Sequence, residues 1–431
     1  IRFGYNEDEL KSLSKDDGSS MAYPENKAHR SGCVVNCGGF PLCSSWFNST
    51  LTNKPNHRYL FVSVLGHPDS LVKPEFAMLG TSSYNAGLIV YDYDIKQQTA
   101  KPIKHIVIPY GAITEMKWVL SDNESESLLA CLCKDGKVRI LRINEQFLLE
   151  HQGYTKLSSA SITIEIPNFT ILSFDWTSPM TLALGLNDGY ISELDIRDPS
   201  NPYYIYSLEI QDIVALTSTY SDKLFTSPEQ KNYSRIIHIS SLNYHSYILD
   251  LDNFCIIVDD DKRTREPKTL VPYSSLLDMF VTLESGFRGV KLQSKRDSQY
   301  QIAFQIPSDV PPCQVCLNDY STIAITGHPS GTVRLSNLGK KLIAGNKPDA
   351  ELASLLRIFK LDRDVAKDAY RLDLGYGVEQ SDSGSKPSTE TIFENELIIT
   401  SLSYRNARDD LGLFSCCYAN GLIVIEKLLG A

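Results

Sequence analysis

Cysteine and histidine are the residues of this chain that could bind a metal or act as nucleophiles. Cys313-Gln-Val-Cys316 has the spacing of half a zinc site or of a redox pair. A zinc site needs further ligands, and no second CxxC or pair of histidines stands at a suitable spacing. Cys33, Cys37 and Cys43 form a looser cluster. We therefore expect buried structural thiols and no metal.

Motifs for catalysis and for nucleotide binding are also incomplete. Gly66-His67-Pro68 and Gly327-His328-Pro329 offer no convergent serine or carboxylate for a triad. No GxGxxG opens a helix after a strand, and GxxxxGK[ST] is missing. The acidic triplet Asp259-Asp260-Asp261 is more typical of a solvated loop than of a metal site. We predict a protein that is not an enzyme and uses no cofactor.

Two groups of side chains are candidates for binding. The basic run Lys262, Arg263 and Arg265 could contact phosphate, although the acidic triplet before it cancels part of its field. Tyrosine combines apolar area with a polar tip and is enriched at interfaces, but it is also common in strands. The candidate partner-binding tyrosines are Tyr203, Tyr204, Tyr206, Tyr220, Tyr233, Tyr244 and Tyr247.

Charge and composition narrow the kinds of partner. The chain has 431 residues, 42 % hydrophobic and 22 % charged, which is the mix of a globular protein. Its net charge of −10 opposes the phosphates of nucleic acid, so we expect any DNA contact to be mainly indirect. No apolar run approaches the length of a membrane span. Ten cysteines in so long a chain indicate a reduced intracellular protein, and a start at Ile1 without a leader suggests a fragment.

A repeat positions these residues. An apolar strand runs into a turn with glycine, and an alternating strand follows, as in Leu128–Gly136 with Lys137–Ile143. Thr181–Gly189 with Tyr190–Ile196 repeats the pattern. Asp-Gly and Asn-Gly favour the positive φ that tight hairpins require. The sequence therefore predicts an all-β fold built from repeated hairpins.

The spacing of the turns predicts the architecture. The turn glycines are expected at Gly87, Gly136, Gly189, Gly286, Gly331 and Gly421, with one further turn near Tyr233-Ser234. Repeats of this length are typical of four-stranded propeller blades. We predict a seven-bladed WD40-like β-propeller over residues 31–431, with residues 1–30 as a polar N-terminal extension without strands.

Three further features refine this prediction. All three tryptophans, Trp46, Trp118 and Trp176, stand at equivalent places in three units, where we expect core packing. Gly32–Cys37 is predicted to supply the outer strand of the last blade, because the last unit lacks room for a fourth strand. A long loop insertion is expected at about 339–391, with a helix at 349–359 and a disordered end at 380–390.

The blade motifs carry a resemblance to a known family. Gly111–Trp118, Leu129–Ile140, Ser173–Trp176 and Leu182–Ile191 resemble the WD-repeat subunit of transcription factor IIIC, in particular the fungal subunit from the half of the factor that recognises the B-box. The resemblance covers residues 105–210 best. It implies a non-enzymatic scaffold in the nucleus that binds a second propeller subunit and the large DNA-binding subunit, and supports RNA polymerase III on tRNA-type genes.

Two other classes of function remain open from the residues. One is a propeller adaptor of another intracellular complex, in chromatin, ubiquitin ligation or trafficking. The other is an enzyme that uses a propeller's central channel, which would need carboxylates or histidines converging from inner strands. The inner-strand candidates are mainly apolar, which favours a scaffold.

Overall fold

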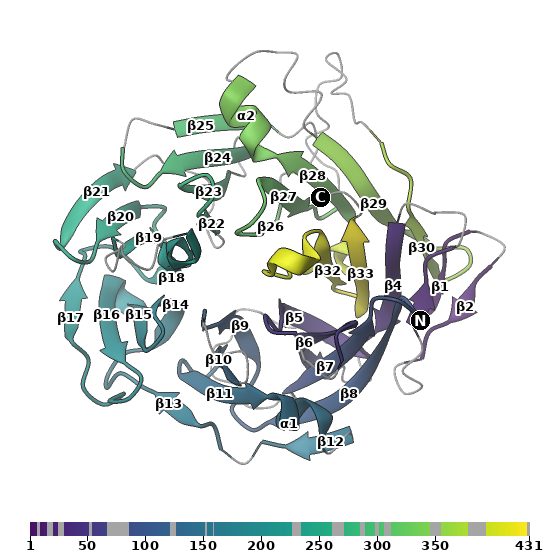
Figure 1. Ribbon diagram of the computed structural model, residues 1–431, viewed down its shortest axis with the longest axis horizontal. Helices are drawn as coiled ribbons and strands as arrows, with labels where there is room; N and C mark the ends of the chain where they lie inside the picture. Colours follow the sequence, from purple (N-terminus) through teal and green to yellow (C-terminus); the bar gives the residue numbers. More distant parts are fainter. Residues whose placement is uncertain are drawn as a thin grey trace. The chain divides into compact units, whose positions relative to one another are not determined.

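The computed structural model describes most of the chain, and Figure 1 shows the arrangement of the strands within it. The residues that it leaves out are 7–8, 15–19, 25–29, 51–53, 67–85, 121–125, 151–152, 158, 226–233, 261–270, 285–288, 298–300, 306–311, 345–354, 378–393 and 429–431. The chain forms two compact units. Unit 1 comprises Ile1–Ile113, Glu145–Ser158 and Ile306–Ala431, and unit 2 comprises Thr114–Asn144 and Ser159–Gln305.

The described strands of unit 1 form three sheets. The first contains β5 (Gly39–Trp46), β6 (His57–Gly66), β7 (Ala86–Asp94), β8 (Thr99–Ile108) and β12 (Gly153–Lys156). The second contains β26 (Gln314–Leu317), β27 (Ile323–Gly327), β28 (Thr332–Asn337), β29 (Leu355–Asp364), β30 (Ala369–Asp373), β1 (Arg2–Gly4) and β2 (Lys11–Ser12). The third contains β31 (Ile399–Tyr404), β32 (Leu413–Tyr418), β33 (Leu422–Leu428), β4 (Arg30–Asn36) and β3 (Ser20–Ala22).

The described strands of unit 2 form four sheets of four strands each. In chain order they are β9 (Ile113–Trp118), β10 (Glu126–Cys133), β11 (Val138–Asn144) and β13 (Ile162–Ile164), then β14 (Ile171–Ser178), β15 (Thr181–Leu186), β16 (Tyr190–Asp195) and β17 (Tyr204–Ser207). They continue with β18 (Ile213–Ser218), β19 (Ile236–Ser241), β20 (Ser246–Asp250) and β21 (Cys255–Asp260), then β22 (Tyr273–Ser274), β23 (Met279–Glu284), β24 (Gly289–Ser294) and β25 (Gln301–Gln305).

Helices are short in the described part of the chain. They are α1 (Glu145–Leu149), α2 (Leu338–Ala344), η1 (Asn187–Gly189), η2 (Tyr220–Phe225), η4 (Asn395–Leu397) and η5 (Arg408–Asp410). No described helix has the length and apolar character to cross a membrane. Successive sheets of this kind, whose strands pair mainly antiparallel, are the blades of an all-β propeller, as the repeat predicted.

The hairpin turns follow the predicted glycines at four positions. Gly136, Gly189, Gly331 and Gly421 have φ of 74°, 73°, 77° and 91°, in the left-handed region that favours glycine. At Gly189 a Cβ atom would also lie 2.1 Å from the carbonyl oxygen of Ile210, so no other residue fits there without a shift.

Two expected turns were placed wrongly, and one lies outside the described residues. Gly87 lies inside β7, not at a turn, and Gly286 is not described. The turn expected near Tyr233-Ser234 lies instead between β19 and β20, where Tyr244 takes a φ of 73°. Because a tyrosine occupies the left-handed position, the glycine signal is missing from that hairpin.

The tryptophans pack in the core, as predicted. Trp46 and Trp176 are buried on β5 and β14, each the first strand of its sheet. The indole Nε1 of Trp46 donates to the carbonyl oxygen of Ser403 on β31 at 3.2 Å. The indole Nε1 of Trp176 donates equivalently to Lys117 on β9 at 3.1 Å. In each unit a buried tryptophan therefore links the first strands of two neighbouring sheets.

The predicted pairing between the early and late parts of the chain is confirmed. β4 pairs antiparallel with β33, with Cys33 opposite Ile425 and Val34 opposite Val424. The strand is slightly longer than predicted and begins at Arg30. Figure 1 shows β4 beside β33 within unit 1.

The expectation that residues 1–30 contain no strand is wrong. β1 pairs in parallel with β30, and β3 pairs with β4. Phe3, Tyr5, Leu13 and Tyr23 are buried in a core cluster of unit 1. These strands have two or three residues, and their apolar side chains stand singly among polar ones. They are too short to show a period.

The expected helix at 349–359 is wrong where the structure describes it. Leu355–Phe359 belong to β29, which pairs with β28 and places Phe359 opposite Val333. Ile358 and Phe359 are buried. Spacings of three and four residues between apolar side chains also occur in a strand with both faces covered, so the pattern was ambiguous. Residues 349–354 and the predicted loop 380–390 lie outside the described residues.

Candidate protein-interaction surface

The CxxC cysteines have structural contacts. The Cys313 thiol lies 3.5 Å from the carbonyl oxygens of both Gly327 and Ile399, and burial raises its pKa to about 12. Burial also raises the pKa of Cys316. In the looser cluster, burial raises the pKa of Cys37 to about 12. Thiols held protonated are poor metal ligands and poor nucleophiles. Among the described residues, no three His, Cys, Asp or Glu side chains group to hold a metal.

The histidine and basic candidates provide no described site. His328 is fully buried, and its Nε2 lies 3.1 Å from Nη1 of Arg334. His67 and the candidate phosphate contacts Lys262, Arg263 and Arg265 lie outside the described residues. Asp259 and Asp260 belong to the paired strand β21 and not to the expected loop, although Asp259 is exposed to solvent as expected.

The candidate tyrosines divide by exposure. Tyr203 and Tyr206 expose 60 % and 51 % of their surface, and Tyr244 is also exposed. Tyr204 and Tyr247 are half-buried. Tyr220 is buried and its hydroxyl donates to the carbonyl oxygen of Leu120 at 2.9 Å, so it is unavailable for a surface contact. Tyr233 lies outside the described residues.

The exposed tyrosines are part of a larger apolar group in unit 2. We call Tyr203, Ile205, Tyr206, Phe254 and Ile256 the outer aromatic surface. They are 41–60 % exposed and lie on or beside the outer strands β17 and β21 of two sheets that are consecutive in the chain. The ring of Phe254 packs edge-on against Tyr206, with centroids 5.6 Å apart.

Sequence reasoning missed three members of this surface. Ile205 and Ile256 stand in apolar runs that resemble buried strands, and only their place on outer strands exposes them. Phe254 lies in the turn between β20 and β21 with φ of 52°. The available signal was a bulky aromatic residue directly after Asp250, Asp252 and Asn253, a combination typical of turns.

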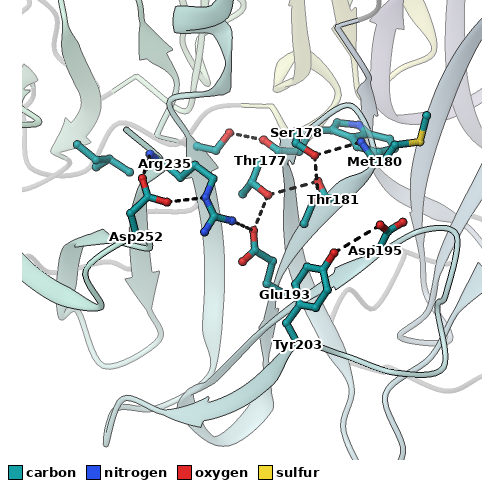
Figure 2. A network of polar contacts seen from close by, with 12 residues as sticks. Thr177, Ser178, Met180, Thr181, Glu193, Asp195, Tyr203, Arg235 and Asp252 are labelled. Atoms are coloured by element: carbon teal, nitrogen blue, oxygen red, sulfur yellow. Dashed lines mark hydrogen bonds and ion pairs between the residues drawn. The ribbon is translucent and has the colours of Figure 1, made fainter. Parts of the chain in front are cut away.

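A polar network fixes the strands beneath this surface. Arg235 donates to Oε1 of Glu193 at 2.8 Å and to Oδ1 of Asp252 at 2.7 Å, and so links two neighbouring sheets (Figure 2). The hydroxyl of Thr177 donates to the same Glu193 oxygen at 2.7 Å. Glu193 is buried, and these donors satisfy its charge.

A second ion pair lies next to Tyr203. Hydrogen bonds from the Arg197 side chain and backbone lower the pKa of Asp195 to about 2. The hydroxyl of Tyr203 lies 3.4 Å from Oδ2 of the same carboxylate (Figure 2). The carboxylate is therefore ionised at neutral pH and orients the edge of the surface.

The chain is similar in sequence to a known transcription factor subunit. No protein-family model matches the chain. It is 20 % identical over 356 residues to the "Transcription factor tau 91 kDa subunit" of Saccharomyces cerevisiae. The match confirms the predicted resemblance to the WD-repeat subunit of transcription factor IIIC. It covers 81 % of this chain and 51 % of the relative, so the chain spans about half the length of the curated relative it matches.

Proposed function

We propose that this chain is a non-enzymatic scaffold subunit of transcription factor IIIC in the nucleus. The observation that carries the proposal is the similarity to the tau 91 kDa subunit over 81 % of the chain. The propeller fold supports it, because propellers present many strands and loops to partners on a rigid frame.

The proposed role at DNA is indirect. With a net charge of −10, the chain's long-range field repels a phosphate backbone. The chain would therefore support B-box recognition on tRNA-type genes through its neighbours, while the assembly provides the affinity for DNA. Local phosphate contacts from Lys262, Arg263 and Arg265 remain part of the proposal.

The proposed partners are a second propeller subunit and the large DNA-binding subunit of the factor. The candidate contacts are the exposed tyrosines Tyr203, Tyr206 and Tyr244, with the half-buried Tyr204 and Tyr247 supporting them. Their exposed rings provide apolar area without charge, as the centre of an interface requires.

We also propose seven blades within residues 31–431, with residues 1–30 as an extension and an insertion at about 339–391. Seven sheets among the described strands support the blade number. Strands β1 and β3 join the extension to unit 1, and β29 and β30 place part of the insertion in a sheet. The described residues 355–364 and 369–373 are therefore paired strands and not the loop that the sequence predicted.

Reconstitution tests the proposed function. The tagged chain is co-expressed with each candidate subunit, and the purified assemblies are titrated against B-box DNA over a range of salt concentrations. We expect stable co-purification, tight B-box binding by the assembly and only weak, non-specific binding by the chain alone. Tight specific binding by the chain alone would overturn the indirect role. Failure to co-purify with either subunit, while mass spectrometry finds the chain in another complex, would overturn the assignment to the factor.

A further inference from the structure

The outer edge of β17 carries no charge, proline or bulge of the kinds that often protect an edge strand. β17 is the last strand of its sheet, and its sequence Tyr-Ile-Tyr-Ser contains no charge and no proline. Its pairing with β16 runs without a register shift, so no bulge twists the edge away. Proteins normally blunt such edges with lysine, proline or bulges, because a bare edge pairs with other chains. This edge can therefore accept a further strand.

The side chains beside this edge are exposed on both faces of the strand. Side chains alternate along a strand, so Tyr203 and Ile205 lie on one face and Tyr204 and Tyr206 on the other. Phe254 packs edge-on against Tyr204 and Tyr206, with centroids 4.7 and 5.6 Å away. An added strand would place its own alternating side chains against apolar surface on each face.

Among the residues that the structure describes, the exposed charges beside the surface are mostly acidic. Asp198 and Glu209 are exposed before and after β17, and Asp259 is exposed after Ile256, whereas the exposed Asp252 is already paired with Arg235. The two arginines of the same stretch are already engaged with carboxylates. Arg197 pairs with Asp195 at 2.5 Å, and Arg235 pairs with Glu193 and Asp252.

We propose that the edge of β17 and the outer aromatic surface bind an extended segment of a partner protein that carries lysine or arginine side chains. The segment adds a strand beside β17, and main-chain hydrogen bonds hold it in the manner of β-strand addition. Its apolar residues contact Tyr206 and Phe254, and its cations pair with the acidic rim. Nucleic acid does not fit this site, because the same carboxylates repel phosphate.

This inference deepens the proposed function and rests on it only for the identity of the partner. The site itself depends on the exposed edge, the aromatic side chains and the acidic rim. It can therefore be tested on the full chain alone, whether or not the chain co-purifies with a subunit of the factor.

Cys255 provides a built-in reporter at this site. It is exposed, directly between Phe254 and Ile256, whereas the other nine cysteines are buried or half-buried. Alkylation of Cys255 by iodoacetamide, followed by mass spectrometry, therefore reports whether the surface is covered. Fluorescence anisotropy of a labelled peptide gives the affinity.

Three peptides of about twelve residues serve as probes: one alternating Lys and Val, one alternating Glu and Val, and the basic one with N-methyl groups along one edge. We expect the basic peptide to bind and to slow the alkylation of Cys255. We expect the acidic and the N-methylated peptides to bind at least about tenfold more weakly, since one loses the charge pairing and the other the strand pairing.

Variants locate the binding. Tyr206→Ala and Phe254→Ala should each weaken the basic peptide by about tenfold, as central aromatic contacts do. Tyr154→Ala changes a tyrosine that is 81 % exposed on β12 in the other unit, and it should have no effect. Equal melting temperatures show that the variants fold. Equal binding of basic and acidic peptides, unchanged alkylation of Cys255, or unchanged affinity in both aromatic variants would each overturn the proposal.

Discussion

Arg30 and Glu426 form a bidentate ion pair. Nε of Arg30 lies 2.7 Å from Oε1 of Glu426, and Nη2 of Arg30 lies 2.7 Å from Oε2. Both side chains are buried. Arg30 also donates to the carbonyl oxygens of Ile358 and Leu374, and the Tyr23 hydroxyl donates to Oε2 of Glu426 at 2.9 Å. The pair fixes β4 to β33 and ties both strands to the neighbouring sheet.

Breaking this pair should destabilise the protein strongly. Glu426→Gln leaves the Arg30 charge buried without a counter-ion, and we expect a loss of about 3–5 kcal/mol in the free energy of unfolding. Urea denaturation followed by tryptophan fluorescence measures it. The control is Lys137→Ala, which breaks an exposed pair with Glu165 and should change stability by less than about 1 kcal/mol. Similar losses in both variants would contradict the buried pair's role.

A second ionic cluster should give a specific dependence on pH. Burial by itself would raise the pKa of Asp410, but the hydrogen bond from Arg58 and the charges of Arg405 and Lys427 outweigh it, so the pKa lies below its usual value. A carboxyl with a lowered folded pKa stabilises the protein above its unfolded pKa of about 3.9, and the contribution disappears as the pH falls further.

Asp410→Asn tests this cluster. We expect a loss of about 3 kcal/mol or more at pH 7, because the cations lose their buried partner. The difference between the wild-type protein and the variant should shrink as the pH falls below about 4, where the wild-type carboxylate is protonated. A difference that stays constant from pH 7 to pH 3 would show that the charge of Asp410 is not the cause.

Replacing Gly189 should lower the stability of the protein for two reasons, backbone strain and a steric clash. Gly189→Ala must place a Cβ atom 2.1 Å from the carbonyl oxygen of Ile210, in a backbone conformation with a φ of 73°. Because the steric clash adds to the backbone strain, we expect a loss in the free energy of unfolding of about 3 kcal/mol or more. Gly153→Ala is the matched control, since Gly153 also has a positive φ but no atom lies within 4 Å of its Cβ position. Thermal unfolding compares them, and equal losses would exclude the contact as a cause.

Thiol reactivity provides a test of burial across both units. Cys255 is exposed, and we expect it to react first with iodoacetamide at pH 8 in the native protein. Burial raises the pKa of Cys37 and Cys417 to about 12, so little reactive thiolate forms there. All ten cysteines should react in denaturant. Rapid native labelling of Cys37 or Cys417 would contradict the packing of unit 1.

The repeat predicted the hairpins well because its signal is local. Asp-Gly at Gly136 and Gly189 reports a turn within a few residues, and the two structural turns agree. The turn at Tyr244 escaped prediction because a tyrosine and not a glycine takes the left-handed position. The strand at Phe359 escaped because its pairing with β28 leaves no trace in the local apolar pattern. The tyrosine group was found from composition alone, but the division between exposed Tyr206 and buried Tyr220 depends on which strand is outermost.

The pairing of β4 with β33 has a consequence for synthesis of the protein. Arg30 and Glu426 are 396 residues apart, so at ribosomal rates of 5–20 residues per second β4 emerges roughly 20–80 s before its partner. During that interval β4 has an unpaired edge, and apolar side chains such as Val34 that are buried in the folded protein face the solvent. An unpaired edge of this kind is prone to aggregation, so translation that stops before Leu422 should yield an aggregating product.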